Sequence, residues 1–259
     1  MTPSRSHLVL IPSYDTGPKL LETVRAARAQ WAPVWVVIDG STDGSAAPVQ
    51  ALAAGDPALR VFMLAVNQGK GAAVLHGLEQ AHAAGFSHAL TMDADGQHPA
   101  DLIGAFMAAS AGRPEAMVLG RPVFDASAPL LRVRGRRVSN AWTNLETLGA
   151  GIDDSLFGFR VYPVAALRDI MRRHRWMRRF DFDTEAVVRL AWRSVTPINL
   201  PAPVKYLSAA EGGVSHFRYG RDNLLLTGMH LRLMAGFLVR LPWLVWRRLR
   251  GLPPFAARR

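Results

Sequence analysis

Short apolar runs alternate with longer amphipathic stretches through the first 120 residues of the chain. The runs are rich in Val, Ile and Leu, which is typical of strands buried on both faces, and the stretches between them have helical length. The pattern predicts strands at Leu8–Pro12, Val34–Ile38, Arg60–Val66, His88–Met92 and Ala116–Leu119. It predicts helices over residues 18–30, 45–54, 71–84 and 99–110.

Strand–helix alternation of this kind predicts an α/β fold with a mostly parallel sheet flanked by helices. In such a sheet the carboxyl ends of the strands form the edge at which ligands bind. Polar clusters follow four of the predicted strands, at residues 13–15, 39–43, 67–71 and 93–95. We therefore expect these clusters to line one shared crevice.

The alternation stops after residue 120. A basic stretch with helical character spans residues 127–149, and it is followed by DDSLFGFRVYP (153–163), an arginine-rich helix, FDFDTEAVVRLAW (180–192) and a strand-like run over 196–206. No repeat or low-complexity linker interrupts the sequence. We expect one domain over residues 1–220 and a C-terminal appendage over residues 221–259.

The formal net charge of +11 is unevenly distributed. Only six of the 31 Lys and Arg lie in residues 1–110, together with nine of the 20 Asp and Glu. The remaining chain is strongly basic and should face an anionic substrate or surface. Aromatic residues are not interleaved with its arginines as a single-stranded nucleic-acid platform requires, so nucleic acid is not an expected partner. The chain has no cysteine, which excludes disulfides and thiolate metal sites.

The segment TMDADGQHP (91–99) carries the most specific chemistry in the sequence. Asp93 and Asp95 are two residues apart, so in extended backbone their carboxylates share a face and repel one another. A divalent cation would offset that repulsion, and Mg²⁺ or Mn²⁺ would leave coordination positions for substrate phosphates. Gln97 has the same parity and could add an oxygen ligand. A solvated acidic loop before Pro99 would explain the same residues without a metal.

Two further residues follow predicted strands. Lys70 lies in the Gly-rich segment NQGKG (67–71), which lacks the Walker A pattern but could offer backbone donors and one cation. Its alternative role is that of an exposed lysine near a helix start. Asp39 precedes Gly40 and Ser41 and could accept a hydrogen bond from a nucleoside, or it could be an ordinary turn carboxylate.

Taken together, these segments resemble family 2 glycosyltransferases of the GT-A fold, and most of all the dolichyl- or polyprenyl-phosphate sugar synthases and related lipid-directed enzymes. The similar segments cover roughly residues 7–220: LIPSYDTGPKL (10–20), VVIDGSTDGS (36–45), NQGKGAAVLHGLEQA (67–81), MDADGQHP (92–99), DDSLFGFRVYP and FDFDTEAVVRLA. The sequence departs from the family pattern at Ile38, where Asp is usual, at Asp15, where Asn is usual, and at Leu156 and Phe157, where small residues are common.

The resemblance implies an inverting transfer of a sugar from a nucleotide-sugar donor, with Mg²⁺ or Mn²⁺, to a lipid-linked or lipid-like acceptor. It assigns nucleoside contacts to Pro12, Tyr14, Asp15 and Asp39. It assigns the metal and diphosphate to Asp93, Asp95 and Gln97, with Lys70 beside them. Phosphate-binding arginines would be Arg121, Arg136 and Arg137, whose guanidinium groups suit phosphate geometry. A solvated basic face is the alternative for each arginine.

A sugar hydroxyl acceptor needs a general base, whereas a lipid phosphate is already anionic. Asp183 and Glu185 occupy the family's acidic position and are the candidates for a base, and Asp154 is a weaker one. They could also be helix-start carboxylates stabilised by the macrodipole. His216 follows a Gly-Gly pair and could reach the metal on a closing loop, or it could be a surface or packed histidine.

Residues 224–250 are apolar with sparse charges, but no uncharged run reaches 18 residues, so no ordinary transmembrane helix is predicted. On a helical projection, Arg232, Arg240, Arg247 and Arg250 form a narrow stripe beside a wide apolar face. This pattern predicts a helix lying in an anionic membrane interface, with Trp243 and Trp246 at headgroup depth. The protein would then be peripheral at the inner face of the cytoplasmic membrane. Packing on the domain or in a homodimer is the alternative, and Pro242 should kink or divide the helix.

Three other functions fit parts of the sequence. A nucleotidyltransferase would use a similar site but release diphosphate. A peripheral membrane protein with a decayed transferase site would explain Ile38, although the intact Asp93 and Asp95 argue against decay. A haloacid-dehalogenase-type phosphatase is disfavoured because Gln97 stands where its motif needs Thr or Val.

Overall fold

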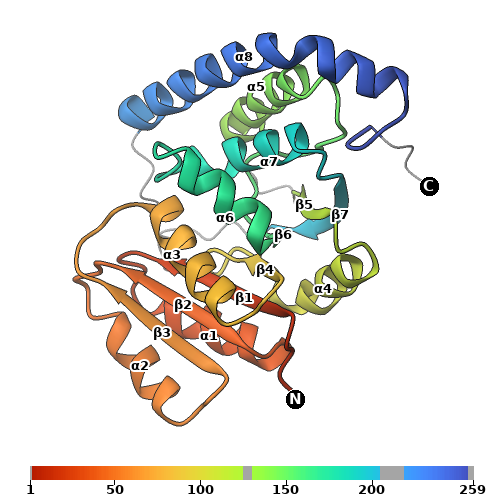
Figure 1. Cartoon of the computed structure of the whole chain (residues 1–259). Coiled ribbons are helices and arrows are strands. Elements are labelled where there is room, and N and C mark those ends of the chain that lie inside the picture. Colours follow the sequence, from red (N-terminus) through yellow and green to blue (C-terminus); the bar gives the residue numbers. More distant parts are fainter. Residues whose placement is uncertain (1, 125–129, 205–218, 256–259) are drawn as a thin grey trace.

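The fold is seen in a computed structural model that describes residues 2–124, 130–204 and 219–255. Within these residues seven strands form one sheet, in the order β3-β2-β1-β4-β6-β5-β7 (Figure 1). The strands are β1 (His7–Ser13), β2 (Val34–Asp39), β3 (Leu59–Leu64), β4 (His88–Thr91), β5 (Met117–Val123), β6 (Arg160–Pro163) and β7 (Pro197–Pro203). The predicted α/β class with a mostly parallel sheet is confirmed.

The helices are α1 (Lys19–Gln30), α2 (Ala46–Ala54), α3 (Lys70–Ala83), α4 (Ile103–Gly112), α5 (Leu130–Glu146), α6 (Val164–Arg173), α7 (Phe182–Trp192) and α8 (Tyr219–Leu249), with a 3₁₀ turn η1 (Ala100–Leu102) before α4. Up to α4, each predicted helix is present with its ends displaced by only a few residues. Pro18, expected in the first turn of α1, lies directly before it.

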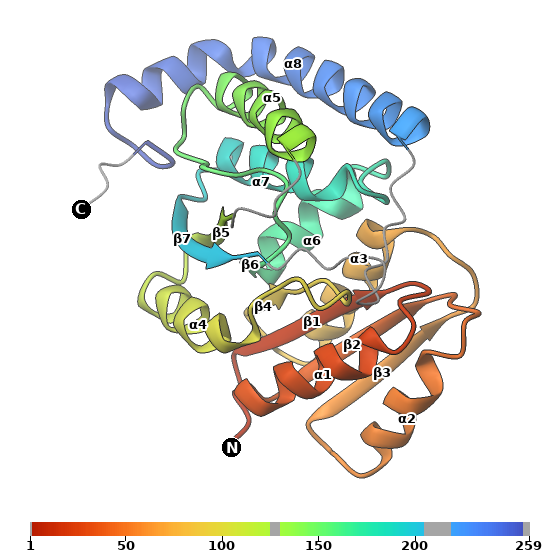
Figure 2. The same ribbon diagram turned by 180° about the vertical axis from the view of Figure 1, so that it is seen from behind.

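Two apolar clusters cover the two faces of the sheet. Buried residues of α1 and α4, including Leu20, Val24 and Phe106, pack on one face. Buried residues of α3, α6 and α7, including Val74, Leu167 and Phe182, pack on the other. The two faces are seen from opposite sides in Figures 1 and 2. Burial on both faces explains why the strands are continuous apolar runs rather than alternating ones.

One strand departs from the parallel pattern. β6 lies between β4 and β5 and pairs antiparallel with both. It is only four residues long and follows the DDSLFGF segment directly, so nothing in its length or periodicity marks it as a central strand. Its position brings residues 153–159 beside the turn that follows β4. This turn contains Asp93 and Asp95.

The C-terminal helix α8 runs across α5 and α7 (Figures 1 and 2). Its inner side buries Met229, Leu233, Phe237 and Leu244 in a third apolar cluster with Val188 and Trp192 of α7. The helix continues through Pro242 instead of dividing there. Its segment Leu224–Leu249 is long and apolar enough to cross a membrane by length and composition alone, contrary to the expectation from uncharged runs.

Candidate active site

Side-chain hydrogen bonds connect the loops at the carboxyl ends of β1 and β2. The Thr42 N–H donates to Asp15 Oδ1 at 2.7 Å, and the Asp15 N–H donates to Ser41 Oγ at 3.0 Å. The Gly17 N–H in turn donates to Asp43 Oδ2 at 2.7 Å. Asp15 has a φ of 42°, in the left-handed region that Asn and Asp tolerate best. The Asp at this position therefore has a local role in the loop, next to the buried Pro12 and half-buried Tyr14.

Asp39, at the end of β2, holds the Gly-rich loop that precedes α3. Its two carboxylate oxygens accept hydrogen bonds from the Gln68 N–H at 2.9 Å and the Gly69 N–H at 2.7 Å. Asp39 is buried, and burial raises its pKa although both hydrogen bonds oppose the shift. The carboxylate therefore holds this loop with one hydrogen bond to each oxygen, and each oxygen can accept a second one.

Lys70 joins two carboxylates that are far apart in the sequence. Its Nζ lies 2.7 Å from Asp93 Oδ1 and 2.7 Å from Asp183 Oδ2. Burial alone would lower the pKa of Lys70, but the charges of Asp183 and Asp93 raise it above its usual range. Burial alone would likewise raise the pKa of Asp93, and the charge of Lys70 outweighs it and holds the pKa low. Lys70 and Asp93 are thus both charged at neutral pH.

Backbone packing fixes this cluster from one side. A Cβ on Gly158 would lie 2.8 Å from Lys70 Nζ and 3.1 Å from Asp93 Oδ2, so only glycine leaves room for the pair. Thr91, at the end of β4, donates to the Gly158 carbonyl at 2.8 Å. The glycine of the DDSLFGFRVYP segment therefore serves the Lys70–Asp93 contact.

His98 orients Asp93 and was not among the predicted site residues. The Asp93 N–H donates to His98 Nδ1 at 2.9 Å, and the ring packs edge-on against Phe157. Burial lowers the pKa of His98 to about 4, so the neutral ring carries its proton on Nε2, 3.6 Å from Asp93 Oδ2. In the sequence, the one indication of this role is that His98 is a polar residue three positions after Asp95.

Asp95 and Gln97 lie in the turn after Asp93, and the Gln97 N–H donates to Asp95 Oδ1 at 3.0 Å. Burial, and then the charge of Asp93, raise the pKa of Asp95 to about 6. A divalent cation would relieve the cost of keeping this carboxylate ionised. Across the described ranges no group of three or more His, Asp or Glu side chains could hold a metal. Mg²⁺ and Mn²⁺ take few carboxylates and bind substrate phosphates as well, and Asp93, Asp95 and Gln97 are the residues that could hold such an ion.

The three base candidates have different surroundings. Asp183 Oδ1 is buried and has no hydrogen-bond partner among the described residues, while Oδ2 binds Lys70. Glu185 is fully buried, and its Oε1 accepts from Arg189 at 2.6 Å and from the Trp176 indole at 3.2 Å. Asp154 Oδ1 accepts from the backbone of Leu156 and Phe157 and pairs with Arg136 at 2.6 Å. Only Asp183 combines contact with the Lys70 cluster and a free oxygen.

Two of the predicted phosphate-binding arginines, Arg121 and Arg136, lie beside the 153–157 turn. Arg136 is bound to Asp154 and stacks on Phe124. The side chain of Arg121 is 56% exposed and lies 3.9 Å from Asp153, and Arg137 is exposed on α5. Arg160, in contrast, is buried and donates to the Asp183 carbonyl and to the Tyr162 hydroxyl, so it supports the site from within. His216 lies outside the described residues.

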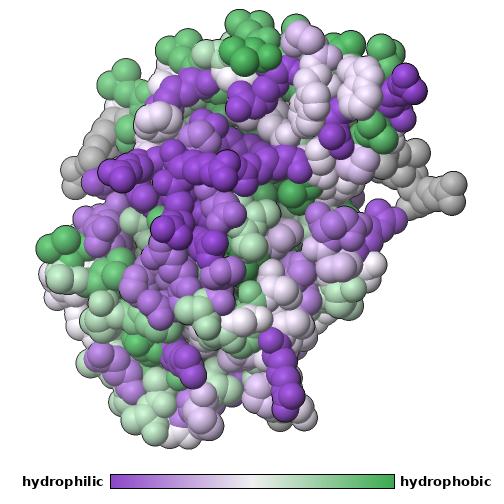
Figure 3. All heavy atoms as spheres, viewed as in Figure 1, coloured by the Kyte–Doolittle hydropathy of each residue, from purple (hydrophilic) through white to green (hydrophobic). Residues whose placement is uncertain are grey.

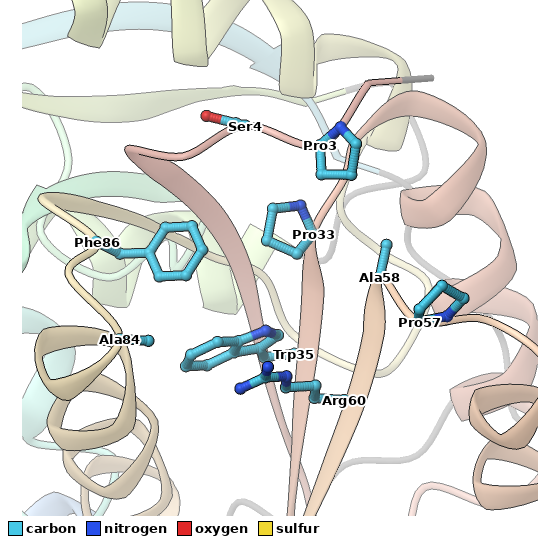
Figure 4. Close-up of a pocket in the computed structure, with 9 residues that line it drawn as sticks. All are labelled: Pro3, Ser4, Pro33, Trp35, Pro57, Ala58, Arg60, Ala84 and Phe86. Carbon is cyan, nitrogen blue, oxygen red and sulfur yellow. The ribbon is translucent and has the colours of Figure 1, made fainter.

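A hollow of about 310 Å³ lies at the other end of the sheet (Figure 4). It is lined by Pro33, Trp35, Ala58, Arg60 and Phe86, with Arg60 stacked over the Trp35 ring. These residues lie near the amino ends of β2 and β3. The hollow is therefore separate from the cluster around Lys70.

Comparison with known proteins assigns the chain to an enzyme family. It matches the model of glycosyl transferase family 2 over residues 8–175, which is more than half of its length. The chain belongs to this family, whose members are nucleotide-sugar-dependent glycosyltransferases.

Three individual proteins are similar to this chain in sequence or in fold. The polyprenol monophosphomannose synthase of Mycolicibacterium smegmatis is 33% identical over 175 residues, which are 65% of this chain and 65% of the length of that protein. Glucosyl-3-phosphoglycerate synthase of Mycobacterium tuberculosis, in complex with Mn²⁺, UDP-glucose and phosphoglyceric acid, is similar with a TM-score of 0.56 at 16% identity, over 92% of this chain and 80% of that one. A mannosyltransferase of Pyrobaculum calidifontis, in complex with GDP-mannose and Mn²⁺, gives a TM-score of 0.53 at 18% identity, over 78% of this chain and 57% of that one. At these identities the structures share a GT-A-type fold with this chain.

Proposed function

We propose that this glycosyltransferase moves a sugar from a nucleotide-sugar donor to the phosphate of a lipid acceptor at a membrane surface. The observation that carries the proposal is the cluster in which Lys70 joins Asp93 of the D-x-D to Asp183. It places a cation and an acidic pair at the carboxyl edge of a parallel sheet, where ligands bind. The similarity to a polyprenol monophosphomannose synthase supports a lipid phosphate as the acceptor.

The donor would lie between the loops after β1, β2 and β4. Pro12, Tyr14, Asp15 and the loop held by Asp39 would contact the nucleoside. Asp93, Asp95 and Gln97 would hold Mg²⁺ or Mn²⁺, which when bound acts as a Lewis acid toward the donor diphosphate. Lys70 adds positive charge beside the leaving group. The cation bound to two structural neighbours of this chain is Mn²⁺.

The acceptor would approach from the side of the 153–157 turn. An acceptor oxygen attacks the anomeric carbon from the face opposite the diphosphate, so the new bond forms as the bond to the diphosphate breaks, and the nucleoside diphosphate leaves with the electron pair. Arg121 is exposed beside this turn and Arg137 is exposed on α5, and both would bind the acceptor phosphate. A phosphate acceptor needs no general base, so the main role of Asp183 would be to hold Lys70.

We also propose that residues 1–220 form the catalytic domain and that residues 221–259 bring it to the membrane. The outer side of α8 exposes Leu231, Leu238, Val239, Trp246 and Leu249, and it is seen as a hydrophobic edge at the top of Figure 3. Neighbouring α5 exposes Val138, Trp142 and Leu145. Exposed apolar residues on two adjacent helices suit insertion into the interface of an anionic membrane. The protein would be peripheral at the inner face of the cytoplasmic membrane.

The first experiment is a product assay with the purified full chain. It is incubated with Mn²⁺ and a set of nucleotide sugars, and the released products are identified by mass spectrometry. The proposal expects a nucleoside diphosphate from one donor class. Release of diphosphate would identify a nucleotidyltransferase instead, and the absence of any metal-dependent product would identify a decayed site.

A further inference from the structure

One side chain of α8 reaches from the C-terminal helix to the segment that carries Asp183. Arg232 Nη2 lies 3.3 Å from Glu185 Oε2 and 3.7 Å from Asp181 Oδ2. Its guanidinium stacks over the Trp176 ring at 5.3 Å from the centroid. The helical projection placed Arg232 in a stripe at headgroup depth, but the side chain is directed inward and is only 34% exposed.

The carboxylates that Arg232 contacts lie two residues to either side of Asp183. Both are buried, and Trp176 is itself bound to Glu185 through its indole N–H. Arg232 therefore contacts both ends of the segment from Trp176 to Glu185. Asp183, near the end of this segment, binds Lys70.

The same segment also covers the start of α3, next to Lys70. The Arg178 carbonyl accepts from the Ala72 N–H at 3.1 Å. A Cβ on Gly71 would overlap the Met177 carbonyl oxygen, and one on Gly69 would overlap that of Arg178. The Gly-Lys-Gly sequence is thus packed directly against the segment that Arg232 holds. A displacement of this segment would move Lys70 through its backbone and Asp183 through its helix.

The charges around Arg232 explain why its contacts with Asp181 and Glu185 matter for the site. Glu185 and Asp181 are buried acidic groups, and the cations beside them are Arg189 and Arg232. Removing one partner of a buried ion pair leaves an uncompensated charge, which is strongly unfavourable. Without Arg232, Glu185 would keep its pair with Arg189, but Asp181 would lose the cation beside it, and the Asp183 backbone lies between these two carboxylates.

We propose that Arg232 is a positioning residue that couples the docking of α8 to the geometry of Lys70, Asp93 and Asp183. The inference rests on the proposed function, because it treats this cluster as the donor site. It makes α8 a part of the catalytic machinery as well as a membrane contact. The contacts of Arg232 predict that deleting residues 224–259 would disturb the donor pocket as well as membrane binding.

Hydrogen–deuterium exchange on the full chain tests the structural part. Arg232→Met should increase exchange over residues 174–185, and Arg232→Lys, which keeps the charge but loses the planar fork, should give a smaller increase. Arg240→Gln is the matched control, because Arg240 lies on the same helix but stacks on Trp192 and donates to the Gly236 carbonyl. Equal exchange in Arg232→Met and wild type would overturn the inference.

Steady-state kinetics with the nucleotide-sugar donor tests the catalytic part. Arg232 touches no proposed donor-binding group, so KM for the donor should stay near the wild-type value. The kcat of Arg232→Met should fall by about 10- to 100-fold, as expected when a small displacement misaligns reacting groups. Increased exchange with an unchanged kcat would overturn the inference. If wild type turns over no donor, the proposed function fails, and the exchange data alone decide whether Arg232 holds the segment.

Discussion

The ammonium group of Lys70, in the first turn of α3, lies 2.7 Å from Asp183 Oδ2, in the first turn of α7. The two residues are 113 positions apart in the chain. Because Lys70 also binds Asp93, this contact connects the D-x-D turn, the Gly-rich loop and the acidic helix start. The arrangement makes Lys70 the common cation of two carboxylates, and its removal should affect the protein more than removal of either acid.

Lys70→Met should destabilise the fold more than Asp183→Asn. Loss of Lys70 leaves the buried carboxylate of Asp183 and the half-buried carboxylate of Asp93 without this cation, and removing one partner of a buried pair costs about 3–5 kcal/mol. Asp183→Asn leaves Lys70 paired with Asp93 and should cost about 1.5–3 kcal/mol, the value of a hydrogen bond to a charged group. Urea unfolding of both variants measures the difference. A more stable Lys70→Met than Asp183→Asn would contradict the shared role of Lys70.

The turnover of Asp183→Asn separates two roles for this residue. If Asp183 only holds Lys70, kcat should fall by about tenfold, as for a residue that orients a ligand group. Loss of a general base would instead cost up to about 10⁴-fold. The proposed phosphate acceptor predicts the smaller loss, measured with saturating donor and acceptor.

Gly158→Ala should impair the site although it adds only a methyl group. The new Cβ would meet Lys70 Nζ and Asp93 Oδ2, both of which are held by other contacts. Overpacking of this kind costs about 1–3 kcal/mol, and turnover should fall because the Lys70–Asp93 pair moves. Gly104→Ala in α4 is the control: its Cβ would enter open space, and the helix should gain about 0.5–1 kcal/mol. Equal stability of the two variants would contradict the close packing at Gly158.

The sequence predicted the elements whose patterns are local. The strands up to β5 are apolar runs, and the polar clusters after β1 to β4 do meet at one edge of the sheet. β6 was missed because its four residues include Arg160 and Pro163, so it is not an apolar run like the equally short β4. Lys70 and Asp183 are far apart in the sequence, so no local pattern predicts their contact.

The structure also shows what surrounds the candidate carboxylates and which side of α8 is covered. Asp39, Asp154 and Glu185 are site candidates from the sequence, and the structure adds that their oxygens accept hydrogen bonds from backbone N–H groups or arginines within the protein. For α8, the helical projection placed Arg232 and Arg240 in one stripe. It could not show which side the domain would cover, so the inward direction of Arg232 was not predicted.

Stability should fall as the pH is lowered from about 6.5 to 4, and His7 should account for part of the loss. Burial, and then the charge of His88, lower the pKa of His7 to about 4, while an unfolded histidine titrates near its ordinary value of about 6.5. The unfolded state therefore binds more protons in this window, which removes up to about 3 kcal/mol of stability as the pH falls. Urea unfolding of wild type and His7→Gln at pH 7 and pH 4.5 measures this part. Equal losses in the two proteins would contradict it.

Membrane binding should depend on the outer side of α8. Leu238→Glu and Val239→Glu place acidic groups on exposed apolar positions and should weaken co-sedimentation with anionic vesicles, because apolar insertion and electrostatic attraction are both reduced. Ala51→Glu, at an exposed position of α2, adds the same charge elsewhere and should leave binding unchanged. High salt should weaken wild-type binding without abolishing it. If wild type stays in the supernatant at low salt, the outer side of α8 does not bind membrane, and a second copy of the chain becomes the alternative partner.

Transfer of the sugar to a lipid phosphate tests the proposed function most directly. The full chain is incubated with the donor that it consumes, Mn²⁺ and vesicles containing polyprenyl phosphate, and the lipid fraction is analysed by mass spectrometry. The account predicts a polyprenyl-phosphate sugar and an equal amount of nucleoside diphosphate, both lost in chelator and reduced by orders of magnitude in Asp95→Asn. Nucleoside diphosphate with only free sugar, or a lipid product that persists in chelator and in Asp95→Asn, would contradict it.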